Sequence, residues 1–259
     1  MSQVLIEKRG HILDICLNRP EKYNALSFAM YQDMAYAYGE FAEDKNLRVA
    51  VIHANGDHFC AGLQLDDWAS VFANGKGVQL KAGQKDPFGI AGEAVNKPVI
   101  IALQGISFTC AVELMLNADI RIAADNCRFA QLEVQRGFHA CGGATLRLPM
   151  EIGWGNAQRY LLTGDEWNAA QALQWGLVQE VLPASEILTK SMQIAERICK
   201  AAPLGVQGSL KSSRYLRAAL EKEAIHNMFR DLQPIMASQD MQEGISAYLQ
   251  RREPNYTGK

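Results

Sequence analysis

The stretch PVIIALQG at residues 98–105 is almost uninterrupted by polar side chains, which is typical of a strand buried on both faces of a sheet. Shorter strand patterns occur elsewhere in the first half, and segments with apolar residues every three or four positions separate them. The predicted strands cover 11–18, 48–53, 98–105 and 119–124, and the predicted helices between them cover 28–41 and 110–117. Strands that alternate with helices indicate an α/β fold with largely parallel pairing.

The second half of the chain is predicted to be mainly helical. The expected helices cover 156–163, 169–175, 185–200, 204–228 and 240–252. AAP at 201–203 interrupts this pattern, so we place a boundary near residue 200 and expect a core of residues 1–200 and a helical region of residues 201–259. Residues 73–91 are rich in Gly, Lys and Gln, and we interpret them either as a mobile loop beside a site or simply as a loop.

Composition and charge exclude several classes of protein. The 259 residues include 26 Lys and Arg against 28 Asp and Glu, for a formal net charge of -2. Nucleic-acid binding is not expected, because phosphate contacts need a surplus of basic side chains. A membrane-spanning helix is not expected either, because no window approaches about 18 uninterrupted apolar residues. The first ten residues do not resemble a secretory signal, and the six cysteines lack C-x-x-C spacing, so we expect a cytoplasmic protein with reduced thiols and no metal site.

Two glutamates lie where a carboxylate is costly. Glu113 has apolar neighbours on both sides in CAVELML, and Glu133 lies in FAQLEV just after a predicted strand. Each one alone is compatible with a solvent-facing position on an amphipathic helix or a surface strand. As a pair in an apolar cleft, two carboxyl groups can instead divide the acid and base steps of a reaction.

Two short turns could stabilise an oxyanion. CAGL at 60–63 follows the strand at 48–53, and ISFTCA at 106–111 leads into the helix that begins near Cys110. Backbone N–H groups at a helix N-terminus have no partner within the helix, and two such groups can hold a developing negative charge. Strand-to-helix turns are common, so this pattern by itself is a weak signal.

Other catalytic motifs are missing from the sequence. It has no G-x-S-x-G, no H-E-x-x-H and no phosphate-binding glycine loop. We interpret Gly142-Gly143 as a tight backbone contact, and His58 and His139 as structural or surface residues.

Several blocks of sequence, in a fixed order, resemble the crotonase superfamily, the enoyl-CoA hydratase/isomerase family. The blocks are NRPEKYNALS (18–27), HFCAGLQL (58–65), KPVIIALQGISFTCAVELMLNADIRIAADNCRFAQLEVQRG (97–137), GGATLRLP, LLTGDEWNAAQALQWGLVQEVLP and SQDMQEGISAYLQRREPNY. The resemblance implies a crotonase-like spiral of β-β-α repeats with a C-terminal helical trimerisation region. It also implies a homotrimer or hexamer that binds acyl-CoA thioesters.

The resemblance also implies roles for particular residues. The two oxyanion-hole donors fall on the backbone N–H groups of Leu63 and Cys110, and the two catalytic carboxylates fall on Glu113 and Glu133. The CoA end of the substrate is expected against four residues: Ala25, Ala61, Gln64 and Leu65. The implied reaction is syn addition of water to a 2-trans-enoyl-CoA, which gives a 3-hydroxyacyl-CoA without a metal or redox cofactor, since coenzyme A is part of the substrate.

The chain departs from the family pattern at the turn before the first glutamate, where Thr109-Cys110-Ala111 replaces a run of glycines. We expect Leu63, Phe108, Cys110, Phe138 and His139 to shape the acyl pocket.

Other functions stay open at this stage. One is another crotonase-type reaction, namely double-bond isomerisation, decarboxylation or thioester hydrolysis. Dienoyl isomerases need a further acid about where Cys141 stands, which disfavours that branch. A non-catalytic acyl-CoA or RNA-binding relative is a further alternative.

Overall fold

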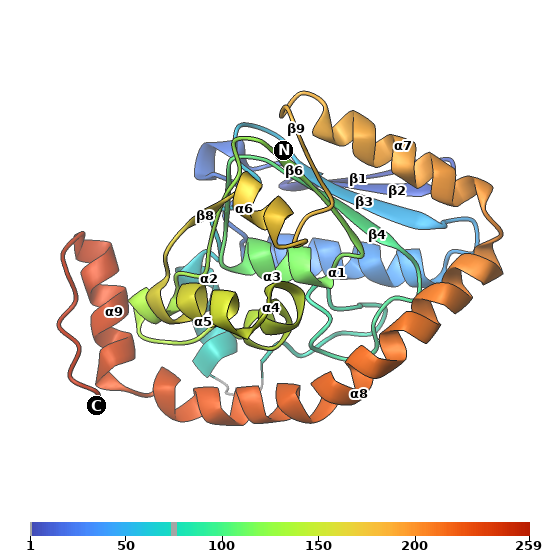
Figure 1. Ribbon diagram of the computed structural model, residues 1–259. Helices are drawn as coiled ribbons and strands as arrows, with labels where there is room; N and C mark the ends of the chain where they lie inside the picture. Colours follow the sequence, from blue (N-terminus) through green and yellow to red (C-terminus); the bar gives the residue numbers. More distant parts are fainter. Residues whose placement is uncertain (1, 74–76) are drawn as a thin grey trace.

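The computed structural model describes residues 2–73 and 77–259 and shows a twisted sheet with helices on both faces (Figure 1). The strands are β1 (Val4–Arg9), β2 (Ile12–Leu17), β3 (Val49–Ala54), β4 (Val99–Leu103), β5 (Ile106–Phe108), β6 (Ile120–Ala124), β7 (Arg128–Ala130), β8 (Trp167–Asn168) and β9 (Glu180–Leu182). Six strands form the large sheet in the order β1-β2-β3-β4-β6-β9, and β5-β7-β8 form a small one. In the large sheet only β1 and β2 pair antiparallel.

The helices follow the strands in a regular pattern. They are α1 (Phe28–Glu43), α2 (Leu65–Ala73), α3 (Cys110–Asn117), α4 (Ala144–Ile152), α5 (Trp154–Thr163), α6 (Ala169–Gln174), α7 (Ile187–Lys200), α8 (Pro203–Met236) and α9 (Gln239–Gln250), with short 3-10 turns η1 (Pro20–Lys22) and η2 (Glu133–Arg136). Each of the units β4-β5-α3 and β6-β7-α4 gives its first strand to the large sheet and its second to the small one. The β-β-α repeats expected from the resemblance are therefore present.

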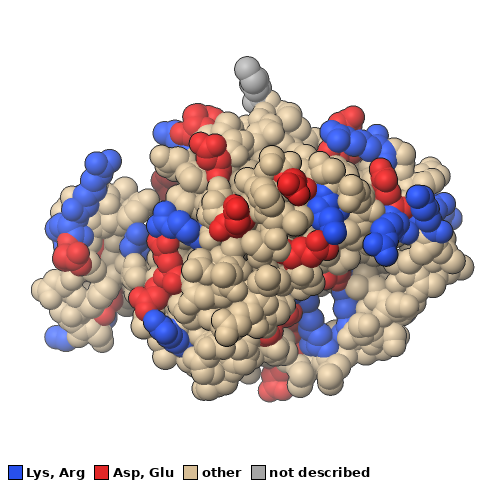
Figure 2. All heavy atoms as spheres, turned by 45° about the horizontal axis from the view of Figure 1, so that its top comes forward, with Lys and Arg blue, Asp and Glu red and all other residues tan. Residues whose placement is uncertain are grey.

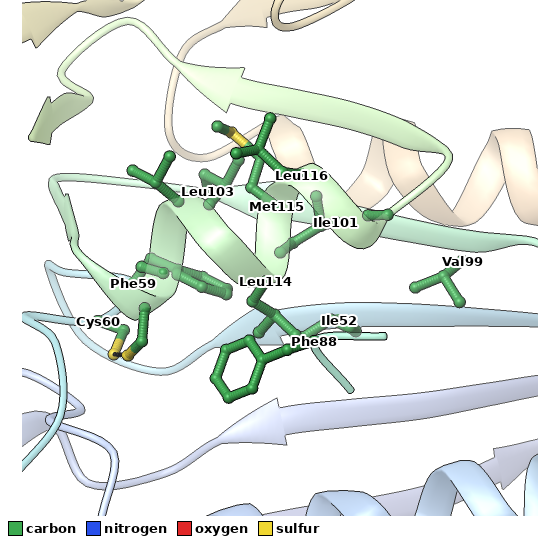
Figure 3. Packing of buried hydrophobic residues seen from close by; sticks show 14 of the residues in the cluster. Ile52, Phe59, Cys60, Phe88, Val99, Ile101, Leu103, Leu114, Met115 and Leu116 are labelled. Atoms are coloured by element: carbon green, nitrogen blue, oxygen red, sulfur yellow. Dashed lines mark hydrogen bonds between the residues drawn. The ribbon is translucent and has the colours of Figure 1, made fainter. Parts of the chain in front are cut away.

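The main core lies between the large sheet and α1 and α3, and α7 covers the opposite face. Alternate residues of β3 separate the two sides, because Ala50 and Ile52 join the main core whereas Val49 and Val51 pack with Ala195 of α7. In Figure 3, α3 lies against the strands through Leu114, Met115 and Leu116, which are buried. α3 is thereby held rigidly on the sheet.

The predicted elements are confirmed, but the strands β1, β5, β7, β8 and β9 and the helices α2 and α4 were not predicted, and α8 extends beyond its predicted end. The strand β1 was not predicted, because all but its first residue are exposed and carry no alternating apolar pattern. The helix predicted to end at 228 continues as α8 to Met236, because its buried face extends from Met228 to Leu232 and Pro234 lies only two residues from the end.

The surface shows charges of both signs close together. On the face in Figure 2, Lys and Arg side chains are interspersed with Asp and Glu, so this face has no continuous basic area. Within residues 2–73 and 77–259, no helix combines the length and the hydropathy needed to cross a bilayer.

Candidate active site

The loop before α2 and the turn before α3 lie side by side. Cys60 and Ser107 form a parallel bridge, and the Phe108 N–H donates to the Cys60 carbonyl over 3.0 Å. Leu63 and Cys110 follow on these two segments, and both line a cavity of about 790 Å³. Among the described residues, neither the Leu63 nor the Cys110 backbone N–H has a hydrogen-bond acceptor. The cavity wall thus contains two residues whose N–H groups are available to a ligand.

Glu113 projects from α3 into the same cavity and is only 5% exposed. Its Oε1 accepts hydrogen bonds from the Gly142 N–H over 2.5 Å and from the Ala144 N–H over 3.2 Å. Burial raises the pKa of Glu113 to about 7, against the opposing effect of these two donors. The carboxyl group is therefore fixed in place and poised to change charge near neutral pH.

Glu133 begins the turn η2 and is also buried. Burial, and then the charge of Glu113, raise the pKa of Glu133 well above its ordinary value. Glu133 is among the residues that line a second cavity of about 120 Å³, and not among those that line the large one. With its amide nitrogen turned toward the Glu133 carboxyl group, Gln131 donates to both oxygens over 2.7 and 2.8 Å. The two glutamates are thus close enough to interact electrostatically, although they line different cavities.

The four residues expected at the CoA end of the substrate come together outside the large cavity. Arg19 Nη1 donates to the Ala25 carbonyl over 3.3 Å and also to Gln64 Oε1, which ties the two loops to each other. The Ala61 N–H donates to the Tyr23 carbonyl over 3.0 Å. Ala25, Ala61, Gln64 and Leu65 are all half-buried, and the last three lie within two residues of Leu63 in the sequence.

The far wall of the large cavity comes from α8 and from the loop after α2. The apolar side chains of α8 on this wall are Ile225, Phe229, Leu232 and Met236. Asp86 shapes the loop, because its buried carboxylate accepts from the N–H groups of Phe88, Ile90 and Ala91 and from the Tyr31 hydroxyl. Residues 77–91 of the loop predicted at 73–91 therefore lie beside the site, whereas residues 74–76 lie outside the described part of the chain.

Comparisons with known proteins bear on the family and the fold of the chain. The profile of the family described as "Enoyl-CoA hydratase/isomerase" matches residues 7–259. The chain belongs to the enoyl-CoA hydratase/isomerase family. It is 32% identical to an enoyl-CoA hydratase of Mycobacterium tuberculosis over 98% of this chain and 96% of that one, and 34% identical to a carnitinyl-CoA dehydratase of Proteus mirabilis over the full length of both. The crystal structure of a probable enoyl-CoA hydratase/isomerase from Mycobacterium abscessus superposes with a TM-score of 0.80 at 37% identity over 99% of both chains.

This member of the enoyl-CoA hydratase/isomerase family carries a strained turn where the family usually has glycines. Thr109 has φ 51° and ψ −113°, a conformation in which a β-branched residue is a genuine outlier. Its carbonyl nevertheless accepts the N–H groups of Val112 and Glu113, and so starts α3 in the register that brings Glu113 to the cavity. Thr109 in place of a glycine therefore strains the backbone before α3, but the helix still begins there.

Three of the residues expected to shape the pocket do not line the large cavity. Phe138 packs with Leu232 and Met241 in a separate apolar cluster, and Phe108 contacts the Arg128 guanidinium. His139 lines the small cavity beside Glu133. These three residues are therefore not part of the large cavity's wall, because nearness in sequence to the glutamates does not fix the direction of a side chain. Leu63 and Cys110 do line the cavity.

Sequence reasoning missed the contribution of Gly142 and of α8 to the site. The interpretation of Gly142-Gly143 as a tight backbone contact is confirmed, but the group in contact is Glu113 itself: a Cβ on Gly142 would lie 2.3 Å from Glu113 Oε2. The apolar wall residues of α8 recur at spacings of four, three and four, a helical period that was detectable in the sequence.

Proposed function

We propose that the protein is a hydro-lyase that adds water to a 2-trans-enoyl-CoA and produces a 3-hydroxyacyl-CoA. The observation that carries this proposal is the position of Glu113. Its carboxyl group is buried and held by two backbone N–H groups beside a cavity whose wall includes Leu63 and Cys110, and the N–H groups of these two residues have no acceptor among the described residues. A base and an anion-stabilising pair around one apolar cavity are the parts that conjugate addition to a thioester requires.

The thioester oxygen binds between the Leu63 and Cys110 N–H groups in this mechanism. Attack of water at C3 moves negative charge onto that oxygen, so the two donors bind the enolate more strongly than the substrate. Removing one donor of this kind typically costs about 3 kcal/mol of transition-state stabilisation. The nonpolar tail of the acyl group extends toward the wall formed by α8.

The two glutamates divide the proton transfers according to their pKa values. Glu113 has a pKa of about 7, whereas that of Glu133 lies well above the ordinary value, so Glu113 ionises while Glu133 keeps its proton. Glu113 takes a proton from the attacking water. Glu133 delivers one to C2, which requires C2 to lie between Glu113 and the small cavity that Glu133 lines. Delivery from the same face of the substrate makes the addition syn. Coenzyme A enters as part of the substrate, with its distal end toward Ala25, Ala61, Gln64 and Leu65, and the residues proposed for catalysis include no metal ligand.

Assembly and location extend the proposal. We infer a homotrimer or hexamer, because large apolar side chains such as Trp154, Leu204 and Leu216 are more than two-thirds exposed in the single chain. A monomer mass in light scattering at micromolar protein concentration contradicts this inference. All six cysteines are free thiols, which suits the reducing cytoplasm.

The decisive experiment follows the absorbance of the conjugated enoyl thioester with crotonyl-CoA and longer 2-enoyl-CoAs. We expect the wild type to remove the absorbance and add the mass of one water, and Glu113→Gln and Glu133→Gln each to lose most of this activity. Glu196→Gln, an exposed substitution on α7, is the matched control and should behave as wild type. A migrated double bond without a gain of water selects isomerisation instead, and no reaction with any chain length rejects the hydratase.

A further inference from the structure

Two cysteines on the adjacent loops of the site have their sulfur atoms in contact. Cys60 Sγ and Cys110 Sγ are 3.9 Å apart, and both side chains are buried. Cys60 lies three residues before Leu63, and Cys110 is the first residue of α3. Figure 3 shows Cys60 beneath the start of that helix. The contact therefore joins the two segments that carry the proposed oxyanion donors.

We propose that Cys60 and Cys110 form a redox-sensitive modification site, which a hydroperoxide converts to an intramolecular disulfide. The disulfide itself does not depend on the proposed function, whereas its effect on hydration does. In the reducing cytoplasm such a bond is transient, as is usual for redox-responsive cysteines.

The chemistry balances with one molecule of hydrogen peroxide. A thiolate of the pair attacks a peroxide oxygen, the O–O bond breaks, and the departing hydroxide takes the thiol proton to give water and a sulfenic acid. The second sulfur then attacks the sulfenic sulfur, the S–O bond breaks, and hydroxide leaves with the second thiol proton as water. Two thiols are oxidised to one disulfide, and both peroxide oxygens are reduced to water.

The surroundings of the pair favour both steps. Contact with the Cys110 thiol, together with a hydrogen bond from the Gly62 N–H at 3.4 Å, lowers the pKa of Cys60 and increases its thiolate fraction. Cys110 lines the large cavity, which gives a small oxidant a path to an otherwise buried pair. The resolving thiol is already in van der Waals contact, so the sulfenic acid is intercepted before further oxidation.

Forming the bond changes the site. A disulfide needs an S–S distance of about 2.05 Å, so the sulfurs must approach by roughly 1.9 Å. Cys110 is joined to the strained Thr109 and begins α3, which the sheet holds in place. We expect this movement to shift the Cys110 N–H relative to that of Leu63, which weakens the binding of an oxyanion.

The test uses the full chain treated with hydrogen peroxide. We expect a mass loss of about 2 Da, a peptide that links residues 60 and 110 in a non-reducing digest, and at least about a tenfold loss of kcat/KM with crotonyl-CoA that dithiothreitol reverses. Absence of the linked peptide overturns the proposal, whether or not the untreated protein hydrates crotonyl-CoA. The mass and peptide readouts therefore separate this proposal from the proposed function.

Two variants make the assignment specific. Cys60→Ser keeps an acceptor for the Gly62 N–H but cannot form the disulfide, so its activity should survive peroxide; Cys60→Ala serves if the serine variant is poorly folded. Cys141→Ala is the matched control, because Cys141 lines the same cavity and is an alternative target of the oxidant. It should stay as sensitive as wild type. A resistant Cys141→Ala, or a Cys60→Ser that is inactivated like wild type, overturns the proposal.

Discussion

The Gly142 N–H donates to Glu113 Oε1 over 2.5 Å, across 29 positions of sequence. The glycine is required at this place, because a Cβ would lie within 2.6 Å of both Oε2 and Cδ of the glutamate. The orientation of the proposed base therefore depends on the absence of a side chain at a residue from another turn of the spiral.

Gly142→Ala should displace the Glu113 carboxyl group and lower kcat by about 10²-fold, because an error near 1 Å in a catalytic group has an effect of that size. Steady-state kinetics with an enoyl-CoA substrate measure it. Gly155→Ala is the control, since a Cβ there meets no atom within 4 Å. Equal activity of the two variants contradicts the positioning role of Gly142.

The pH dependence of turnover should follow the two glutamates. Glu113, with a pKa of about 7, must be ionised to accept a proton from water, so kcat/KM should fall tenfold per pH unit below about pH 7. Glu133 must be protonated, so a second decline is expected at higher pH, as its pKa is raised. A rate profile that is flat from about pH 5.5 to 7 rules out Glu113 as the base.

The free energy of unfolding should fall as the pH rises, whereas a salt-bridged carboxylate makes it rise. Because burial raises the pKa of Glu113 from 4.5 to about 7, the folded state binds more protons than the unfolded state in this window, and the free energy of unfolding falls as pH rises through it. Glu113→Gln should therefore stabilise the protein by up to about 3 kcal/mol at pH 8, and by much less at pH 5. Urea unfolding at both pH values tests this, with Glu196→Gln expected to show no such difference.

Thr109→Gly should increase stability by about 1 kcal/mol, because glycine adopts φ 51° and ψ −113° without the strain of a β-branched residue. The urea midpoint is the measurement. Thr163→Gly, at the last residue of α5, provides the comparison and should destabilise by a similar amount. If both substitutions destabilise equally, Thr109 stores no strain.

The buried ion pair between Arg147 and Glu221 should fix the cavity wall. Arg147 donates to both Glu221 oxygens and to the carbonyls of Phe88 and Gly89, so it joins α4, α8 and the loop that lines the cavity. Glu221→Gln should destabilise the protein by about 3 kcal/mol and raise KM more than it lowers kcat. Glu223→Gln on the exposed side of α8 is the control, and an unchanged KM in Glu221→Gln contradicts the role of the pair.

Apolar runs and helical spacing within one segment predicted the strands and helices that such a segment forms by itself. The apolar run at 98–105 became β4, and CAVELMLN became α3 at the predicted bounds, because burial on both faces and helical spacing are visible within one segment. The contacts of Cys60 with Cys110 and of Gly142 with Glu113 join residues 50 and 29 positions apart, and no short-range pattern specifies them. The cavity itself was not predictable for the same reason, since α8 reaches it from the far end of the chain.

Many enzymes use the same elements for the reaction and for the choice of substrate. In this protein, the placement of α8 separates the two. Glu113, Glu133 and the two N–H groups lie on the spiral core, whereas much of the apolar wall proposed to face the acyl tail comes from α8, in the last quarter of the chain. Substitutions along one stripe of that helix can change which acyl groups fit without disturbing the reacting atoms. The choice of substrate can therefore diverge independently of the chemistry.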